Sequence, residues 1–392
     1  MMSNPETKPD AIQLSIVLPC LNEAGNISTA LSYARELAQN LPYGVEILVS
    51  DNGSTDGSIE LAEKEGARVV HCPKKGYGFA LLHGIEEAQG KWLLMGDADG
   101  TYDFREATVL LKGLEDGMDL SMGSRLKGEI EPGAMPFLHR WLGTPVLTFF
   151  IRLFFGLKIS DCNCGMRAFT REAYDRMGLV SGGMEFASEM LIKSALLGLN
   201  VRETPISLGR SEKERAPHLN TWRDGWRHLR FILLFAPHVV FQIPGWILLG
   251  LGLLISLPVL FAPLNVAGRM FDYHYLFFGL PLFHMGYQAL WLAHLDARFL
   301  DFSGLAPSSR PPSRPRSIEF WLMIGGLSTA FGVGCLLAIL FIWIRSGYDE
   351  LNQIRLGILG VSSLYFGVQS IMNAFFSGML DLKISRRTTA ST

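Results

Sequence analysis

Apolar and polar residues follow different patterns in the two halves of the chain, and the first half reads as strands and helices in turn. Short apolar runs rich in Val, Ile and Leu predict buried strands at residues 12–19, 45–50, 67–71 and 92–95. Segments with helical periodicity lie beside them, at residues 25–40, 58–66 and 78–88. Strands that alternate with helices predict a parallel sheet covered by helices on both faces. We detect no internal repeat in the sequence.

The second half is dominated by stretches that contain no Asp, Glu, Lys or Arg. Four such stretches occur, at residues 231–268, 273–295, 320–344 and 356–380. Each is as long as, or longer than, the roughly 20 apolar residues that cross a bilayer. The first is too long for one span and contains four prolines, so we expect an interfacial helix at 221–240 before the span begins. The spans are expected at 241–263, 274–296, 320–344 and 356–380, within a membrane domain over 241–382.

The second of these spans is interrupted by His274, His284 and His294. A buried or re-entrant helix is therefore an alternative interpretation of that stretch.

Basic residues predict how the spans are oriented. Arg310, Arg314 and Arg316 follow the second span, and the tail at 383–392 is also basic. Because positively charged loops stay on the cytoplasmic side, we expect both termini and the first half of the chain there. Gly268 and Gly347 are then expected on the other side. If the source is bacterial, this describes an inner-membrane protein.

Composition agrees with a chain that is part soluble and part membrane. Hydrophobic residues make up 48% and charged residues 18% of 392, which is apolar for a soluble chain but too polar for one that is membrane throughout. The formal net charge of -2 predicts no nucleic-acid partner. Five cysteines, an odd number, fit a reducing compartment without a disulfide framework. Residues 1–11 lack the apolar segment of a signal peptide and are expected to be a tail.

Asp97 and Asp99 are the most informative polar residues. They follow the apolar run at 92–95 and are separated only by Ala98. Carboxylates at the end of a buried strand emerge at the edge of the sheet where open α/β folds bind ligands. Two hard oxygen donors one residue apart can hold Mg²⁺ or Mn²⁺ and leave positions free for a diphosphate. A tight turn rich in Asp and Gly is the alternative.

A weaker phosphate signal lies at Lys75 and Gly76, just before the helix expected at 78–88. Backbone amides at the start of a helix and a nearby lysine both attract anions. The full G-x-G-x-x-G fingerprint is absent, which disfavours a dinucleotide-binding fold.

Four motifs together resemble a known family. They are P-C-L-N-E at 19–23, S-D-N-G-S-T-D-G at 50–57, G-Y-G at 76–78 and G-D-A-D at 96–99. Their order and spacing are similar to those of family 2 glycosyltransferases with the GT-A fold. Further elements at 123–125, 161–167, 183–189 and 220–230 resemble the polyprenyl-phosphate glycosyltransferases, the branch that contains dolichyl-phosphate mannose and glucose synthases. The resemblance covers about residues 12–244.

The resemblance implies an α/β GT-A (Rossmann-like) catalytic domain at 12–220, followed by an all-α transmembrane domain of four helices. It also implies a set of donor-binding residues: Pro19, Asn22, Glu23, Asp51, Asn52, Lys75, Gly76 and Asp97. Carboxylates at strand ends suit ribose hydroxyls and base N–H groups. Helix capping is the alternative role for Asn22 and Asp51.

The same resemblance makes Asp97 and Asp99 the metal ligands. Thr101 stands where the dolichyl mannose branch often has Gln, which leaves a third protein ligand open. The expected acceptor-binding residues are Arg125, Asp161, Arg167 and Arg215, with Arg125 also counted as catalytic. An arginine matches two phosphate oxygens at once, although each could instead be a solvated surface residue. Cys162 to Cys164 replace the middle of the family's acceptor loop, so the details of that loop stay open.

Two segments combine aromatic and basic residues in a way that is typical of helices lying in the lipid headgroup plane. They are residues 137–158 and 221–233. An ordinary core helix with a basic outer face is the alternative for each.

The predicted function is metal-dependent, inverting transfer of a sugar from a UDP- or GDP-sugar to a polyprenyl phosphate, undecaprenyl or dolichyl. A processive polysaccharide synthase is one alternative, but the Q-x-x-R-W motif of those enzymes is absent from the sequence. A transporter with a degenerate glycosyltransferase-like domain is another. The sequence leaves open the sugar, the nucleotide base, the lipid chain and any homo-oligomer.

Overall fold

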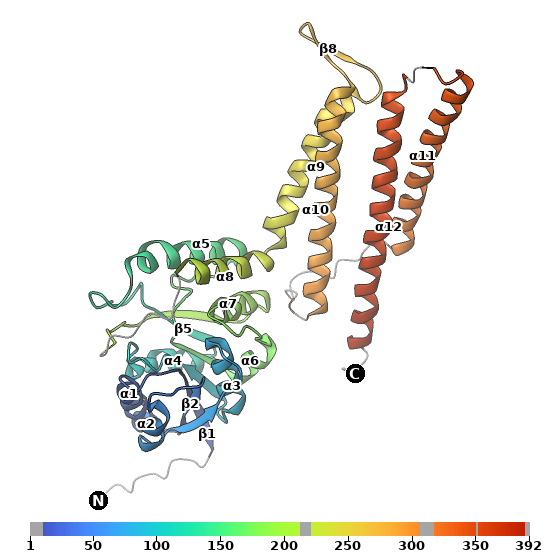
Figure 1. The fold of residues 1–392 in the computed structure, drawn as a ribbon. Helices are drawn as coiled ribbons and strands as arrows, with labels where there is room; N and C mark the ends of the chain where they lie inside the picture. Colours follow the sequence, from blue (N-terminus) through green and yellow to red (C-terminus); the bar gives the residue numbers. More distant parts are fainter. Residues whose placement is uncertain (1–10, 212–220, 304, 306–316, 350–351, 389–392) are drawn as a thin grey trace, which may run out of the picture. The chain divides into compact units, whose positions relative to one another are not determined.

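The structure is a computed structural model, and it describes residues 11–211, 221–303, 305, 317–349 and 352–388. The chain divides into two compact units, Met1–Phe235 and Ala236–Thr392 (Figure 1). We describe each unit by itself.

A seven-stranded sheet forms the centre of the first unit. Its order is β3-β2-β1-β4-β6-β5-β7, and β6 runs antiparallel to both of its neighbours. The strands are β1 (Ile12–Cys20), β2 (Gly44–Asp51), β3 (Arg68–His71), β4 (Trp92–Met95), β5 (Leu120–Ser124), β6 (Arg167–Thr170) and β7 (Val201–Pro205). The first four are the strands that the sequence predicts, and their parallel pairing confirms the expected α/β fold.

In the described residues of the first unit, eight α-helices accompany these strands. They are α1 (Ile27–Asn40), α2 (Ser58–Lys64), α3 (Tyr77–Glu87), α4 (Thr108–Glu115), α5 (Thr144–Phe155), α6 (Arg171–Met177), α7 (Phe186–Leu196) and α8 (Thr221–Leu234). Leu14, Ile16 and Leu18 of β1 have no exposed surface, because β1 is in the middle of the sheet and helices pack on both of its faces.

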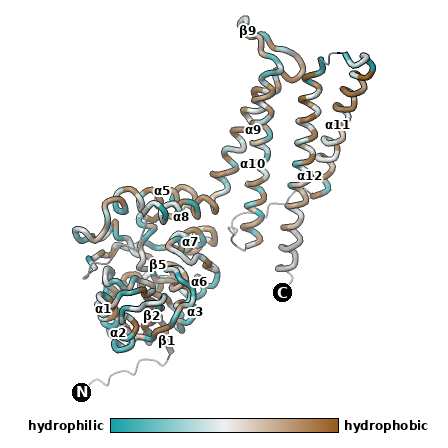
Figure 2. Tube along the Cα trace, in the orientation of Figure 1, coloured by the Kyte–Doolittle hydropathy of each residue, from teal (hydrophilic) through white to brown (hydrophobic). Residues whose placement is uncertain are grey.

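The described residues of the second unit contain four helices that are long and apolar enough to cross a membrane. Their candidate spans are His238–Val259, Tyr273–Phe302, Ile318–Arg345 and Ile354–Leu380. They contain α9 (Ile243–Ser256), α10 (Leu276–Phe302), α11 (Ile318–Arg345) and the first part of α12 (Ile354–Thr388). Figure 2 shows apolar residues along most of their length. The count of four confirms the sequence prediction, and the second span is one continuous helix despite its histidines.

These four helices form two hairpins of the same design, which the sequence analysis missed. In each helix two glycines lie seven residues apart and face the partner helix of the hairpin. A Cβ added at Gly252 of α9 would come within 2.7 Å of the Gly279 carbonyl of α10. A Cβ at Gly332 of α11 would come equally close to the Gly360 carbonyl of α12. The second contacts pair Gly245 with Gly286 and Gly325 with Gly367. Close backbone approach at small residues is the usual packing of membrane helices, so the unit repeats one hairpin twice.

Polar side chains join the two hairpins along α10 and α12. Gln288 accepts hydrogen bonds from the amides of Gln369 and Asn373, and the Tyr287 and Ser370 hydroxyls are 2.6 Å apart. Gln288 and Gln369 each stand two residues after the second glycine of their helix, at equivalent positions of the repeat. At the end where both hairpins turn, Asp272 pairs with Arg355.

Candidate active site

Polar residues gather where β1, β2 and β4 end. β1 pairs with β2 on one side and with β4 on the other, so the chain changes direction across the sheet at this point. In open α/β sheets ligands bind outside the carboxyl ends of the strands at such a switch point. The residues following these strands include Glu23, Asp51 and Asp97.

Asp97 and Asp99 follow β4 and differ in their partners. The Tyr77 hydroxyl donates to Oδ1 of Asp97 at 2.8 Å. Burial, followed by the neighbouring Asp99 carboxylate, raises the pKa of the Asp97 carboxyl to about 7, although the Tyr77 hydrogen bond and the Arg125 charge act in the opposite direction. Two neighbouring carboxylates repel each other when both are ionised, and a bound divalent cation would stabilise the doubly ionised pair. The residues present therefore fit the metal predicted from the sequence.

Thr101 holds Asp99 in place. Its hydroxyl and its backbone N–H both donate to Oδ1 of Asp99, at 2.6 and 3.1 Å. The residue that replaces the expected Gln thus orients one predicted metal ligand. Within the described residues no group of three His, Cys, Asp or Glu side chains is placed to hold a metal ion. A cation would then depend on Asp97, Asp99 and the oxygens of its substrate.

The two asparagines predicted to bind the donor use their side chains inside the protein. The Asn22 carbonyl oxygen accepts from the Thr55 amide at 2.9 Å, and Asn22 has a left-handed backbone with φ of 57°. The Asn52 side chain donates to the Lys74 carbonyl and accepts from the Gly76 amide, both at 2.7 Å. These contacts fix one loop against the next. They are not the helix caps of the alternative interpretation, because the N-cap residues of the neighbouring helices are Asn26, Gly57 and Gly76.

The carboxylates beside them are buried. Glu23 is 4% and Asp51 3% exposed. The Gly53 and Ser54 amides donate to Asp51 at 3.0 and 2.9 Å. Burial alone would raise the pKa of Asp51, but these bonds hold it below its usual value, so the group stays an anionic acceptor.

Three predicted donor residues remain. Pro19 is buried in β1, whereas Lys75 and Gly76 directly precede α3, and Lys75 is exposed. Gly76 has φ of 147°, and a Cβ there would lie 2.3 Å from the carbonyl oxygen of Gly182. Only glycine fits, so the sequence signal at 76–78 reflects a close backbone approach beside Tyr77, which itself bonds Asp97.

Arg125 forms a two-pronged ion pair with Asp161. Nε and Nη2 of Arg125 donate to the two carboxylate oxygens at 2.7 and 2.8 Å, and the Arg125 amide donates at 3.1 Å. The Arg125 side chain is 14% exposed and the Asp161 side chain 0%. Asp161 was expected to contact the acceptor itself, but its carboxylate is enclosed and bonded to Arg125. It therefore orients the arginine instead.

Arg167 also differs from the prediction. Its side chain is fully buried, and its guanidinium donates to the carbonyls of Cys164, Ala187 and Cys162 at 2.9, 2.7 and 2.7 Å. A guanidinium enclosed in this way presents no face to an acceptor phosphate, so Arg167 supports the fold. Burial lowers its pKa, while its neighbours act in the opposite direction. Arg215, the other predicted acceptor residue, lies outside the described residues.

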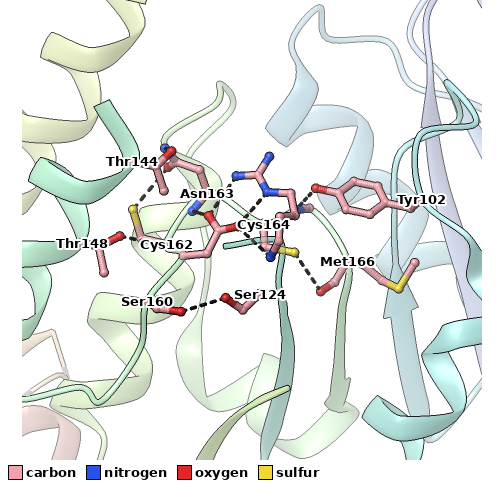
Figure 3. A network of polar contacts seen from close by, with 12 residues as sticks. Tyr102, Ser124, Thr144, Thr148, Ser160, Cys162, Asn163, Cys164 and Met166 are labelled. Atoms are coloured by element: carbon pink, nitrogen blue, oxygen red, sulfur yellow. Dashed lines mark hydrogen bonds and ion pairs between the residues drawn. The ribbon is translucent and has the colours of Figure 1, made fainter. Parts of the chain in front are cut away.

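The segment at 160–165, which we name the cysteine loop, passes close to both Arg125 and Asp97. Figure 3 shows its polar contacts, including Tyr102, whose hydroxyl accepts from the Gly165 amide at 2.8 Å. A Cβ at Gly165 would lie 2.8 Å from Oδ2 of Asp97, so the loop backbone abuts the predicted metal ligand. Tyr77 and Tyr102 were not predicted as site residues, since nothing in their local sequence marks them as partners of the carboxylates.

Aromatic side chains are exposed on two helices that pack against each other, α5 and α8 (Figure 1). We give the name aromatic surface to the exposed apolar side chains of these two helices and of residues 137–143 just before α5; they include Phe137, Trp141, Phe149, Leu153, Trp222 and Trp226. The inner face of α5 is buried through Leu147 and Ile151. Helix α5 therefore has one buried face, which the core-helix alternative requires. It also has one exposed apolar face, which the prediction of a helix in the lipid headgroup plane requires.

Family models match two parts of the chain. Residues 15–178 match "Glycosyl transferase family 2", and residues 298–381 match "Glycosyltransferase family 2 C-terminal transmembrane region". The hexosyltransferase Agl6 of low-salt glycan biosynthesis in Haloferax volcanii is 36% identical over 372 residues, which are 94% of this chain and 89% of that protein.

Two further proteins are similar over the first half. The human dolichyl-phosphate beta-glucosyltransferase is 30% identical over 243 residues, covering 57% of this chain and 75% of its own. A crystal structure of Mycobacterium tuberculosis glucosyl-3-phosphoglycerate synthase with Mn²⁺ and UDP-glucose aligns with 22% identity and a TM-score of 0.45, over 57% of this chain and 78% of that chain.

Proposed function

The chain belongs to glycosyltransferase family 2, and we propose that it transfers one sugar from a nucleotide-sugar donor to a polyprenyl phosphate at a membrane. The observation that carries this proposal is the position of Arg125. Asp161 of the cysteine loop holds it, and Gly165 of the same loop abuts Asp97, in a chain whose described residues include four membrane-length helices. A metal-binding carboxylate pair suits the donor diphosphate, and a neighbouring arginine suits a second phosphate. The human relative's name, dolichyl-phosphate beta-glucosyltransferase, supports a lipid phosphate acceptor.

On the donor side, Asp51 and Glu23 would accept hydrogen bonds from the nucleoside, since both are ionisable groups at strand ends. Asn22 and Asn52 would shape the loops that present them. Lys75 and the amides at the start of α3 would lie near the phosphates. Asp97 and Asp99 would hold Mg²⁺ or Mn²⁺, which when bound neutralises charge developing on the leaving nucleotide.

On the acceptor side, Arg125 would hold the lipid phosphate in line with the anomeric carbon. A phosphate monoester has a second pKa of about 6, so at neutral pH it is already a dianionic nucleophile and needs no general base. The residues of this chain then contribute position and positive charge, which let two anionic substrates approach. A single displacement of this kind inverts the configuration of the sugar.

The aromatic surface would rest in the lipid headgroup plane, where amphipathic rings and arginines are both stable. Arg140, which stacks at 5.5 Å on the Trp141 ring, supports this role. The basic segments that follow the second and fourth spans support a cytoplasmic location for the catalytic unit and both termini. There the unit would meet nucleotide sugars.

The test is to incubate the purified full chain in lipid with a panel of UDP- and GDP-sugars, a polyprenyl phosphate and Mn²⁺. Mass spectrometry of the lipid fraction should find one donor that gives a polyprenyl-phosphate-sugar. Failure of every donor to modify the lipid, with hydrolysis or polymer formation instead, would refute the proposal.

A further inference from the structure

The cysteine loop is tied to two different elements of the first unit, to β7 through Ser160 and Asp161 and to α5 through Cys162 and Asn163. We propose that Thr148 of α5 and Glu203 of β7 are positioning residues that hold this loop so that Asp161 keeps Arg125 in place for the acceptor. The inference rests on the proposed function, because it takes Arg125 as the acceptor-binding group.

The tie to α5 is made by two buried threonines. The Thr148 hydroxyl accepts from the Cys162 amide at 3.1 Å, and the Thr144 hydroxyl is bonded by the Asn163 side chain at 3.2 Å (Figure 3). Thr148 is 3% and Thr144 2% exposed, so water does not substitute easily for these contacts. Phe149 and Leu153 on the same helix belong to the aromatic surface. The loop is therefore attached to the helix that we propose rests on the membrane.

The tie to the sheet is made by one buried carboxylate. Oε1 of Glu203 accepts from the Ser160 and Asp161 amides at 2.7 and 2.9 Å, and Oε2 pairs with Lys127 at 2.7 Å. The Glu203 side chain is 1% exposed. A buried charge with this set of partners fixes the backbone on which Asp161 stands, since loss of any one bond would leave an unpaired polar group.

From these two ties the contacts continue into the site. Asp161 holds both prongs of Arg125, and Gly165 at the other end of the loop abuts Asp97. A shift of the loop would move Arg125 first, while Asp97 would keep its place just after β4 and its hydrogen bond from Tyr77. Loosening the loop should therefore weaken binding of the acceptor more than binding of the donor.

The loop carries its own reporters. Cys162 and Cys164 have no exposed surface, and burial raises the pKa of each thiol to about 12. A buried, protonated thiol reacts with a maleimide only when the loop opens. The rate of Cys162 labelling, read by mass spectrometry of its peptide, thus measures loop opening without any substrate.

The experiment uses the full chain in lipid with Thr148→Val, Thr148→Ser, Glu203→Gln and the wild type. Valine keeps the shape of threonine but cannot accept the Cys162 bond, and serine keeps the hydroxyl. A net hydrogen bond is worth about a factor of five in such an equilibrium, so Thr148→Val should label Cys162 roughly fivefold faster. The apparent KM for polyprenyl phosphate should rise by a similar factor, with the Kd for the donor nucleotide unchanged. Glu203→Gln should also raise the Cys162 labelling rate and the apparent KM for polyprenyl phosphate. Thr148→Ser should leave both values as in the wild type.

Ser121→Ala is the matched control, because the buried Ser121 hydroxyl has no hydrogen-bond partner within the described residues. It should leave labelling and KM as in the wild type. Unchanged Cys162 labelling in Thr148→Val would overturn the proposal. It would also be overturned if Thr148→Val weakened donor binding as much as it raised the acceptor KM and Thr148→Ser had the same effects. If the wild type ignores polyprenyl phosphate, the proposed function fails, while the labelling rates still decide whether the two residues hold the loop.

Discussion

Both carboxylate oxygens of Asp161 accept hydrogen bonds from the Arg125 guanidinium, and the Asp161 side chain is fully buried while the Arg125 side chain stays 14% exposed. The pairing changes what each residue is expected to do. Arg125 keeps its charge and a fixed orientation, which suits a phosphate-binding group, whereas Asp161 sets that orientation from below the surface.

Arg125→Ala should impair use of the acceptor. Loss of a charge-assisted phosphate contact costs about 1.5 to 3 kcal/mol, so the apparent KM for polyprenyl phosphate should rise roughly tenfold to a hundredfold or kcat should fall as much. Arg125→Lys should rescue poorly, because an ammonium cannot make a two-pronged contact with Asp161. Calorimetry should show nearly unchanged donor binding.

Arg202→Ala, which removes an exposed arginine paired with Asp116, is the control. A collapse of donor binding with normal acceptor dependence would assign Arg125 to the donor site.

Asp99→Ala should remove metal-dependent turnover and leave the fold intact. One of the two predicted protein ligands is lost, and we expect turnover to fall about a hundredfold or more. Thr101→Val should have a milder effect, raising the Mn²⁺ concentration for half-maximal activity, because it removes the hydroxyl that orients Asp99. Asp175→Ala, an exposed carboxylate, is the control. Full turnover of the wild type in EDTA would rule out the metal.

The aromatic surface should matter only when the acceptor is embedded in a bilayer. Trp141→Ser together with Phe149→Ser removes two exposed rings without touching the buried face of α5. Activity on long-chain polyprenyl phosphate in vesicles should fall several-fold, while activity on a short, water-soluble prenyl phosphate should stay normal. Equal losses on both acceptors would mean that these rings support the fold and not membrane contact.

The membrane unit should expose both of its hairpin turns on the side away from the cytoplasm. Val266 lies in the turn of the first hairpin and Ser346 at the turn of the second, and both are exposed. A membrane-impermeant maleimide added from outside the cell should label Val266→Cys and Ser346→Cys, but not the partly exposed native Cys72 of the catalytic unit. Outside labelling of Cys72 with protection of the two turns would reverse the orientation.

The sequence predicts β1 to β4 and misses β5, β6 and β7. β4 is found at Trp92–Met95, as expected, because every residue in it is apolar. β6 begins with Arg167 and ends with Thr170, and it reads as a strand only once it pairs between β4 and β5. Arg167 was mistaken for a phosphate ligand because its burial against the carbonyls of Cys162, Cys164 and Ala187 depends on how the chain folds around it.

The site shows the same division between local and long-range information. Asp97 and Asp99 could be predicted from the sequence because they directly follow the apolar strand that places them. Tyr77 and Glu203 act on residues 20 and 42 to 43 positions away, so their roles depend on the fold. The hairpin repeat was overlooked because the two copies share little beyond their glycines, which matter through close backbone contact, and one glutamine, which acts through a hydrogen bond between the hairpins.

The most direct measurement of the central claim is the chemical form of the acceptor after reaction. Full-length protein in lipid, given polyprenyl phosphate, Mn²⁺ and the active nucleotide sugar, should convert the lipid from a phosphate monoester to a phosphodiester that carries one sugar. Phosphorus NMR should report the change of ester, and mass spectrometry should report the mass of a single sugar with the configuration at its anomeric carbon inverted. A lipid that stays a monoester while the donor is consumed, or a product carrying a growing chain of sugars, would contradict the account.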